Sequence, residues 1–435
     1  MSITDAPHPA ETHPAPDLPP ATAPAGGGCP VLHGAGPGRT NADEVASLRA
    51  HGPAPQVELL PGGVSARVVL SHNLVKLLSS SPHVSRDWSR HGPAQDDKTM
   101  VPWYWAWSVQ TAGANALNAY GEAHRKLRAP VALALARRRV EAMKPVIAEI
   151  VRAALEDLAD GPSTVDLVPA FALRVPHQVV ICLLGMPEQL LVPFHTAAAG
   201  LFATDASAEE MALSMQGIRD VLAQLVALRR EQPGGDDLVS DLIREAETDE
   251  NSLTDTELRD QLLLVITAGV ETTVHAIGTL LVDLMTHDEA RTLVTRSQEA
   301  MEDAMEESLR RRSPATAVPT RFMVEDVTDP VSGQTLHKGE RVILHLAAAG
   351  TDPDVYEDPE RFDITRATSR QHLAFGYGPH FCPGAALARL EITTAVREFL
   401  QRFPATRLTI SEAELPSVQS FIVTGYQSIP VQLAG

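Results

Sequence analysis

The chain has 435 residues, of which 44% are hydrophobic, and its formal net charge at pH 7 is −19. That length allows one large domain or two ordinary ones, and the acidic balance argues against a protein that binds nucleic-acid backbones, which normally carries a basic excess. The three cysteines, Cys29, Cys182 and Cys382, are too few for a disulfide framework or a four-cysteine zinc site. We therefore expect a protein that needs no disulfides and binds no nucleic acid.

The first forty residues and the most apolar stretch set the domain organisation. Residues 1–40 hold nine prolines and a glycine triplet at 26–28 without an apolar run, which is typical of a disordered tail. The most apolar stretch, residues 262–285, is interrupted by Glu271, His275 and Asp283, whereas a membrane span needs about 20 apolar residues in a row. We predict a disordered tail over residues 1–40, a single domain over residues 41–435 and no contact with a membrane.

In chain order, the predicted elements begin with a hairpin and continue mostly as helices. Two apolar runs in residues 56–70 flank Pro61-Gly62-Gly63, a turn signal that predicts a β-hairpin. Apolar residues at helical spacing predict helices over residues 139–158, 174–186, 208–230 and 254–286. Pro145 predicts a kink or a later start in the first of them. Short strands at 321–324 and 341–346, a helix over 384–402 and a hairpin over 422–431 follow. The fold class is mainly α with small β-sheets (α+β).

The segment before the last long helix carries the strongest chemical signal. Residues 375–384 read Phe-Gly-Tyr-Gly-Pro-His-Phe-Cys-Pro-Gly and continue into an amphipathic helix. Gly376 and Gly378 allow backbone angles and close approaches that a side chain forbids. Cys382 precedes a helix N-terminus, which favours a thiolate. From these residues alone, Cys382 is a nucleophile, a redox sensor, an axial metal ligand or a buried structural cysteine.

The whole string resembles Phe-Gly-x-Gly-x-His-x-Cys-x-Gly, the haem-binding loop of the cytochrome P-450 family. The resemblance implies the cytochrome P-450 fold, with the haem between an oxygen-activation helix and the helix that follows the cysteine loop. It implies that Cys382 is the axial ligand of the iron of haem b (iron protoporphyrin IX), a thiolate that favours O–O cleavage. It also implies that further loop residues bind the cofactor, namely Phe375, Gly376, His380 and Gly384.

The helix predicted over residues 254–286 contains Ala268-Gly269-Val270-Glu271-Thr272-Thr273. An acidic side chain in an apolar helix is costly unless paired, and the Thr272 hydroxyl can bond back to the Ala268 carbonyl. These features fit either a slightly irregular core helix or a functional groove. The string resembles the family's oxygen-activation motif, which implies a catalytic set of Ala268, Gly269, Glu271 and Thr272. In that set Gly269 makes room for dioxygen, while Glu271 and Thr272 deliver protons.

Glu307 and Arg310 are three residues apart on a predicted helix and therefore share a face. With Pro359-Glu360-Arg361-Phe362 downstream, the arrangement resembles the Glu-x-x-Arg motif of the family and the later arginine that completes its ion-pair cluster. The resemblance implies that Glu307, Arg310 and Arg361 form a structural cluster that holds the scaffold around the cysteine loop.

His124 and Arg128 are four residues apart on a predicted helix and can present two donors to one anionic group. The alternative is a solvated surface pair. They resemble the His-x-x-x-Arg element of the family, which implies that they bind the haem propionates together with Arg321 and His380.

The resemblance implies a soluble, cytoplasmic monooxygenase, and residues 119–121 and 124–128 (AYG and HRKLR) look like an actinobacterial subgroup acting on polyketides or steroids. The expected substrate is an apolar small molecule (a polyketide, macrolide or steroid-like metabolite), hydroxylated with O2. No flavin or iron-sulfur domain fits in the remaining residues, so the two electrons come from a ferredoxin and an NAD(P)H-dependent ferredoxin reductase. Arg125, Lys126 and Arg389 form either a basic patch for the ferredoxin or a solvated face. Alternatives are a haem-thiolate coupling or peroxide-using enzyme, and a non-catalytic haem sensor.

The substrate contacts are predicted from two kinds of residue. Aromatic side chains crowd the segment where the family has a variable loop over the haem, and they either line an apolar pocket or anchor the loop. Aliphatic residues stand where the family usually contacts substrate. The candidates are Trp103, Trp105, Trp107, Val265, Val318 and Ile422.

Overall fold

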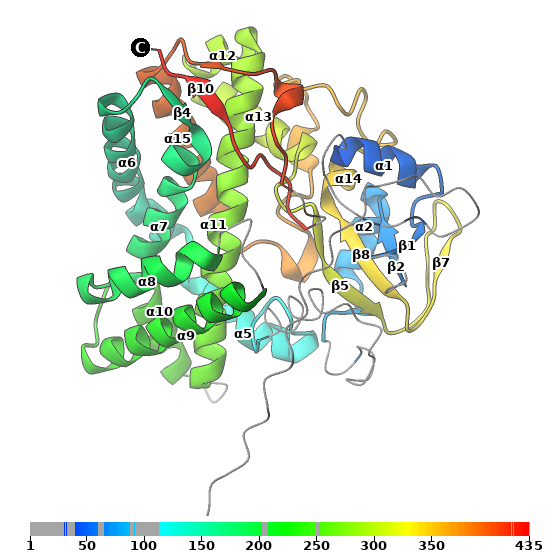
Figure 1. The fold of residues 1–435 in the computed structure, drawn as a ribbon. Coiled ribbons are helices and arrows are strands. Elements are labelled where there is room, and N and C mark those ends of the chain that lie inside the picture. The colour runs from blue at the N-terminus through cyan, green and yellow to red at the C-terminus, as the bar shows by residue number, and fades with distance from the viewer. Residues whose placement is uncertain are drawn as a thin grey trace, which may run out of the picture.

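The computed structural model describes residues 30, 32, 40–59, 65–87, 91, 113–201, 208–248, 253–418, 420 and 422–434. The tail predicted over residues 1–40 falls almost entirely outside them. Figure 1 shows most of the helices gathered on one side of the molecule, and the largest sheet with several short helices on the other. The mainly α class with small sheets is confirmed.

Helices make up most of the described chain. They are α1 (Asn41–Arg49), α2 (His72–Ser80), α5 (Gly121–Ala134), α6 (Arg137–Asp160), α7 (Arg174–Leu184), α8 (Glu188–Leu201), α9 (Ala208–Glu231), α10 (Leu238–Thr248), α11 (Asp255–Thr286), α12 (Asp288–Val294), α13 (Gln298–Arg311), α14 (Leu346–Gly350) and α15 (Ala385–Arg402), with short helical turns η1 (Val168–Ala172), η2 (Ser369–Gln371), η3 (Gly378–His380) and η4 (Glu412–Glu414). The predicted long helices are therefore present, and α6 continues through Pro145.

The strands are short. They are β1 (Gln56–Glu58), β2 (Ser65–Val69), β3 (Val84–Ser85), β4 (Thr164–Asp166), β5 (Ala317–Met323), β6 (Val327–Thr328), β7 (Thr335–Leu336), β8 (Arg341–His345), β9 (Arg407–Leu408) and β10 (Pro430–Gln432). They form a five-stranded sheet in the order β1-β2-β8-β5-β3, a three-stranded sheet β4-β10-β9 and the pair β6-β7.

The largest sheet joins strands from the N-terminal part of the chain to strands from residues 317–345. The hairpin predicted over residues 56–70 is confirmed, since β1 and β2 pair antiparallel with Val57 opposite Ala66. β2 then pairs in parallel with β8, whereas β5 pairs with β8 antiparallel. The register between β5 and β8 shifts between Val318 and Arg321. Such irregularities re-aim side chains, and this one lies directly before Arg321.

The hairpin predicted over residues 422–431 is wrong. β10 pairs with β4 and β9 rather than with residues near 422, and Val423 bridges to Ala315. Local alternation of apolar residues indicates an extended chain but does not determine which distant strand it joins.

α11 is the central helix of the core. Thr254 caps its N-terminus, where the hydroxyl accepts from the Glu257 backbone N–H and the Glu257 carboxylate accepts from the Thr254 N–H. Among the described residues, α11 alone is long and apolar enough to cross a membrane, but 67% of its most apolar window is buried inside the protein. It therefore has the burial expected of a core helix.

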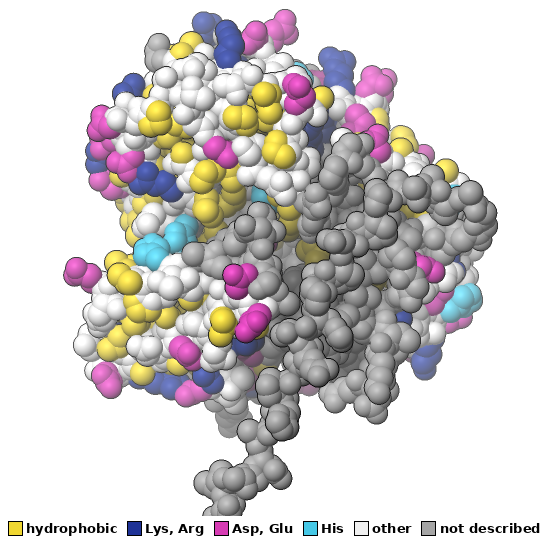
Figure 2. Space-filling view, viewed as in Figure 1, with side chains coloured by type: hydrophobic (Ala, Val, Ile, Leu, Met, Phe, Trp, Pro, Cys, Tyr) yellow, Lys and Arg dark blue, Asp and Glu magenta, His cyan; other side chains and the backbone are white. Residues whose placement is uncertain are grey.

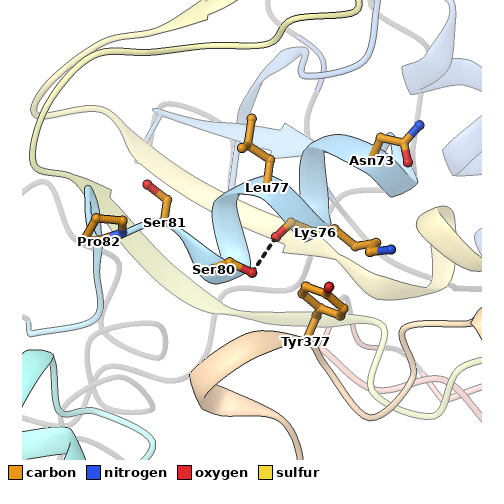
Figure 3. Close-up of a pocket in the computed structure, with 7 residues that line it drawn as sticks. All are labelled: Asn73, Lys76, Leu77, Ser80, Ser81, Pro82 and Tyr377. Atoms are coloured by element: carbon orange, nitrogen blue, oxygen red, sulfur yellow. Dashed lines mark hydrogen bonds between the residues drawn. The ribbon is translucent and has the colours of Figure 1, made fainter.

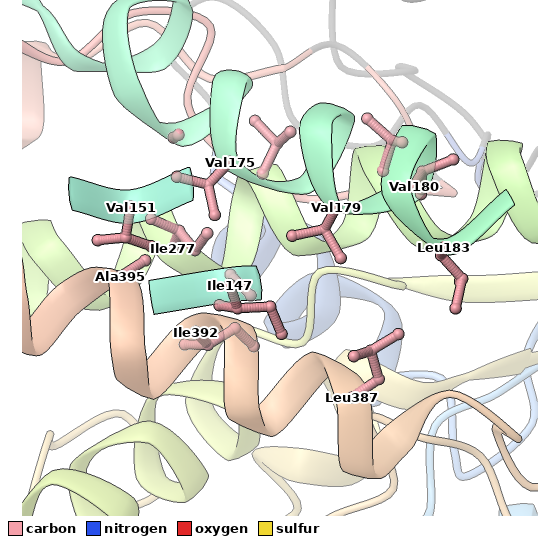
Figure 4. Packing of buried hydrophobic residues seen from close by; sticks show 14 of the residues in the cluster. Ile147, Val151, Val175, Val179, Val180, Leu183, Ile277, Leu387, Ile392 and Ala395 are labelled. Atoms are coloured by element: carbon pink, nitrogen blue, oxygen red, sulfur yellow. The ribbon is translucent and has the colours of Figure 1, made fainter. Parts of the chain in front are cut away.

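The core packs α6, α7 and α15 around α11 (Figure 4). Ile147 of α6, Val179 of α7 and Ile277 of α11 are fully buried, and the rings of Phe171 and Phe399 lie 5.3 Å apart. Burying an aliphatic side chain of this size contributes about 1.5–3 kcal/mol. This packing fixes α11 and α15, which carry the two strongest motifs, in one rigid body.

Candidate active site

The cysteine loop runs from Phe375 to the N-terminus of α15, with η3 inside it. The Cys382 backbone N–H donates to the Phe375 carbonyl oxygen at 2.8 Å, and the Gly376 N–H donates to the Leu373 carbonyl oxygen at 2.8 Å. Gly376 adopts a φ of 73°, which residues with a side chain rarely adopt. The loop is therefore a closed turn that holds Cys382 at a fixed position.

The outer side of the loop packs against α2. Gly378 has a φ of 68°, and a Cβ there would lie 2.9 Å from the Ser79 carbonyl oxygen, so only glycine fits. The neighbouring Tyr377 helps to line a cavity of about 560 Å³ next to α2, with the Lys76 ammonium 5.0 Å from the centre of its ring (Figure 3). The lining of this cavity includes neither Cys382 nor a residue of α11.

The Cys382 side chain is half-buried. Burial raises the pKa of the Cys382 thiol, whereas a hydrogen bond from the Gly384 backbone N–H and the positive charges of Arg128 and Arg389 act in the opposite direction. The surroundings thus supply partial compensation for a negative sulfur, as a metal-ligating thiolate requires.

Four cationic or imidazole side chains gather beside this loop from three elements. His124 and Arg128 come from α5, Arg321 from β5 and His380 from η3. The His124 and His380 ring centres lie 4.1 Å apart, and the Arg128 guanidinium donates to the Phe381 carbonyl oxygen. The structure therefore brings together the residues predicted to bind the propionates.

The electrostatics of this cluster favour an anion. Burial, followed by the charges of Arg321, His124, Arg86 and Arg128, lowers the pKa of His380 to about 2. Arg321 Nη1 and His124 Nε2 are buried with no hydrogen-bond partner among the described residues. Buried donors and charges are costly until they are paired. The residues present therefore fit the two propionate carboxylates of a haem.

On α11, the predicted oxygen-activation motif forms an accessible patch on a core helix. The side chains of Ala268 and Glu271 are exposed and that of Thr272 is half-buried, although the helix is buried from Thr273 to Met285. The Thr272 hydroxyl donates to the Ala268 carbonyl at 2.6 Å, which is the back-bond expected from the sequence. Although part of Glu271 is accessible, the surrounding protein desolvates its carboxyl and thereby raises the pKa of this group. A Cβ on Gly269 would meet only Val180, at 3.8 Å.

The structural ion-pair cluster is present with one correction. The Arg310 guanidinium donates to both carboxylate oxygens of Glu307, at 2.7 and 2.8 Å, and both side chains are fully buried. The third member is Arg366, whose Nε lies 3.1 Å from Glu307 Oε1. The prediction of Arg361 was wrong, because its side chain is exposed and only its carbonyl oxygen accepts from Arg310 and Arg366.

The substrate candidates are only partly brought together. Trp103, Trp105 and Trp107 lie outside the described residues. The Ile422 carbonyl oxygen accepts from the N–H groups of Thr316 and Ala317, which places Ile422 beside the start of β5, the strand that carries Val318. Val265 packs against the main helical cluster instead.

Sequence reasoning missed Arg86 and Arg366. Arg86 donates to the Asn118 side-chain oxygen at 3.0 Å and is close enough to lower the pKa of His380. It stands in a region without a recognised motif, so no spacing pointed to it. Arg366 lies five residues after Arg361, and no spacing in the sequence distinguishes the two arginines.

Comparison with known proteins gives a consistent result. The family model described as cytochrome P450 matches residues 201–424. The chain is 34% identical over 389 residues to the vitamin D(3) 25-hydroxylase of Pseudonocardia autotrophica, covering 89% of this chain and 92% of that protein.

The chain belongs to the cytochrome P450 family. A further relative of this P450 is the 6-deoxyerythronolide B hydroxylase of Saccharopolyspora erythraea, at 36% identity over 72% of this chain and 76% of that protein. The fold of the present chain matches that of CYP154A1 from Streptomyces coelicolor A3(2) with a TM-score of 0.80 at 37% identity, covering 93% of this chain and 100% of that one. CYP154C4 from Streptomyces sp. W2061 gives 0.82 at 34% identity, covering 94% and 98%. The protein is thus a P450 monooxygenase, and the cofactor of its family is a haem with a cysteine thiolate ligand.

The residues expected to form a basic patch on this P450 differ in their partners. Arg125 is exposed, whereas the Lys126 ammonium lies 3.3 Å from the Glu257 carboxylate. Arg389 is 35% exposed and is paired with the buried Glu306. Figure 2 shows acidic and basic side chains interspersed over the described part of one face.

Proposed function

We propose that this P450 hydroxylates an apolar small molecule of the polyketide, macrolide or steroid type, using haem b held by Cys382. The observation that carries the proposal is the cluster of arginine and histidine side chains beside the cysteine loop, in which the buried atoms Arg321 Nη1 and His124 Nε2 have no partner among the described residues. The substrate class is supported by the relatives, which include a vitamin D(3) 25-hydroxylase and a 6-deoxyerythronolide B hydroxylase.

The chain's own residues would bind and orient the cofactor. His124, Arg128, Arg321 and His380 would hold the propionates, and Phe375, Gly376 and Gly384 would shape the loop against the macrocycle. When bound through Cys382, the haem supplies an iron centre at which dioxygen is activated. Arg128 therefore serves twice, because it also donates to the Phe381 carbonyl within the loop.

The proposed reaction consumes two protons, since a substrate RH, O2, two electrons and two protons give ROH and H2O. Thr272 and Glu271 are the proposed proton carriers on α11. The Thr272 hydroxyl donates a hydrogen bond to the Ala268 carbonyl, so its oxygen lone pairs remain free to accept a hydrogen bond from a second donor. Burial raises the pKa of the Glu271 carboxyl, so it holds a proton to higher pH than an ordinary glutamate and can pass that proton on. Gly269 and Ala268 leave room beside them.

We assign the two electrons to a ferredoxin and an NAD(P)H-dependent ferredoxin reductase, and the location to the cytoplasm. Exposed Arg125 is the residue of the proposed patch best placed to meet an acidic partner, because Lys126 and Arg389 have carboxylate partners in the structure. Val265, Val318 and Ile422 remain the proposed substrate contacts, together with Trp103, Trp105 and Trp107.

The proposal is tested by an optical titration of the purified ferric protein with a panel of steroids and macrocyclic polyketides. A ligand that displaces water from the iron should produce a low-to-high spin shift. That ligand, with NADPH, a surrogate ferredoxin and reductase, and labelled O2, should yield a product that contains one labelled oxygen. A spin shift followed by a coupled product without labelled oxygen would instead support the oxidative-coupling alternative. Turnover with peroxide alone would favour peroxide use, and ligand binding without NADPH consumption would favour a sensor.

A further inference from the structure

Glu306 stands next to Glu307 in the sequence but is not part of the structural ion-pair cluster. Glu306 is 1% exposed, and its carboxylate bonds to His372 and Arg389 rather than to Arg310. Its carboxylate accepts from His372 Nε2 at 2.7 Å and from Arg389 Nε at 2.6 Å. Arg370 stands 3.8 Å from the same group. A buried carboxylate thus joins α13, the segment after η2 and α15, the helix that begins just after Cys382.

From Glu306 the contacts lead to the cysteine loop by two routes. The Arg389 guanidinium lies 4.4 Å from the centre of the Phe375 ring, and the Phe375 carbonyl accepts from the Cys382 N–H at 2.8 Å. On the other side, His372 Nδ1 accepts from the Ala374 N–H at 3.1 Å. Glu306 therefore holds the groups on both sides of Phe375, the residue to which Cys382 is hydrogen-bonded.

Glu306 and Arg389 carry opposite charges in this chain of contacts. Burial disfavours the Glu306 carboxylate, but hydrogen bonds from His372 and Arg389 outweigh it and lower the pKa of Glu306 to about 2, so the group is ionised. The positive charge of Arg389 acts on Cys382 in the direction that favours a negative sulfur. The electrostatic potentials of two opposite charges in contact largely cancel at points farther away, so Glu306 reduces the positive potential that Arg389 exerts on the cysteine loop.

We propose that Glu306 is a positioning residue for the thiolate loop, which fixes Arg389 against Phe375 and sets the net charge beside Cys382. The inference rests on the proposed function, since the measurable consequence is the reduction potential of the iron that Cys382 holds. A net positive charge near a redox centre stabilises its reduced state and raises its potential. Arg389 therefore raises the reduction potential of the iron, and Glu306 lowers it.

This inference changes the expected role of Arg389. As a member of a ferredoxin-docking patch, Arg389 would affect the KM for ferredoxin and its salt dependence. As the partner of Glu306, it affects the potential of the enzyme without ferredoxin present. A variant that alters only the KM for ferredoxin would overturn the inference.

The test is spectroelectrochemical titration of the haem-loaded protein. Glu306→Gln keeps the shape and removes the negative charge, so it should raise the midpoint potential. Arg389→Gln should lower it, and the double variant should return close to wild type. We expect each single change to alter the reduction equilibrium two- to tenfold, at most about 59 mV for a one-electron couple. Asp303→Asn is the matched control, because Asp303 lies on the same helix and contacts Arg370 at 2.9 Å.

Shifts of the same sign in both single variants, or none, would refute the charge coupling, since a merely structural role predicts no sign reversal. If Glu306→Gln fails to bind haem, Arg389→Gln alone still tests the inference, because its side chain is partly exposed and a fall in potential is required. If the wild-type protein itself gives no thiolate-type carbonyl spectrum, the proposed function fails rather than this inference.

Discussion

Replacing Arg366 with alanine tests the revised ion-pair cluster. The Arg366 guanidinium bonds to Glu307 at 3.1 Å and to the carbonyl oxygens of Glu357 and Asp358 at 2.6 and 3.2 Å. Hydrogen bonds that involve a charged group contribute about 1.5–3 kcal/mol. Glu307 remains paired with Arg310 in this variant, so the loss of stability should be smaller than when a buried charge loses its only partner. We expect a loss of about 2–4 kcal/mol in the free energy of unfolding.

The assay is thermal unfolding of the haem-loaded protein. An unfolding entropy of about 2.1 cal/mol/K per residue over 435 residues makes each kcal/mol worth about 1 °C, so Tm should fall by about 2–4 °C. Arg361→Ala is the matched control, because its side chain is exposed and the change should stay within about 0.5 kcal/mol. An equal or larger fall in Tm for Arg361→Ala would refute the assignment of Arg366.

Three further predictions follow from the geometry. Gly378→Ala should destabilise the protein by about 2 kcal/mol or more, because it adds a clash with the Ser79 carbonyl to the strain of a left-handed backbone. Gly333→Ala is the control and should cost less, because Gly333 has a similar φ of 73° but nothing within 4 Å of an added Cβ. Equal Tm values for the two variants would contradict the clash. Thr272→Ala should oxidise NAD(P)H while product falls and peroxide rises; full coupling would remove Thr272 from proton delivery. Burial, then the charge of Arg49, lowers the pKa of His345 to about 4 from 6.5, so the unfolded chain takes up a proton first and stability falls as pH drops from 6.5 to 4. His345→Asn should make that loss shallower in urea titrations, whereas an unchanged slope would contradict it.

Local patterns predicted the elements that depend on neighbouring residues. The 3.6-residue periodicity of α6 and α11 and the pairing of the neighbouring strands β1 and β2 are properties of short segments, so these elements were predicted to within a few residues. The cysteine loop was found because its constraints are also local: Gly376 and Gly378 adopt positive φ, and Cys382 bonds back to Phe375.

Features set by distant contacts could not be predicted in this way. The choice between Arg361 and Arg366 depends on which guanidinium reaches Glu307 across more than 50 residues of chain. The same holds for β10, whose partners β4 and β9 are separate in sequence. Glu306 stood beside a recognised motif, but its bonds to His372 and Arg389 appear only when three segments pack together.

The ligand assignment of Cys382 carries the whole account, and one measurement tests it directly. The difference spectrum of the reduced, carbon monoxide-treated protein should show the thiolate-type band in the wild type. The Cys382→Ser variant should bind haem through the arginine and histidine side chains of His124, Arg128, Arg321 and His380 but lose that band. Retention of the thiolate-type band in Cys382→Ser would contradict the assignment of Cys382, and with it the proposed active site.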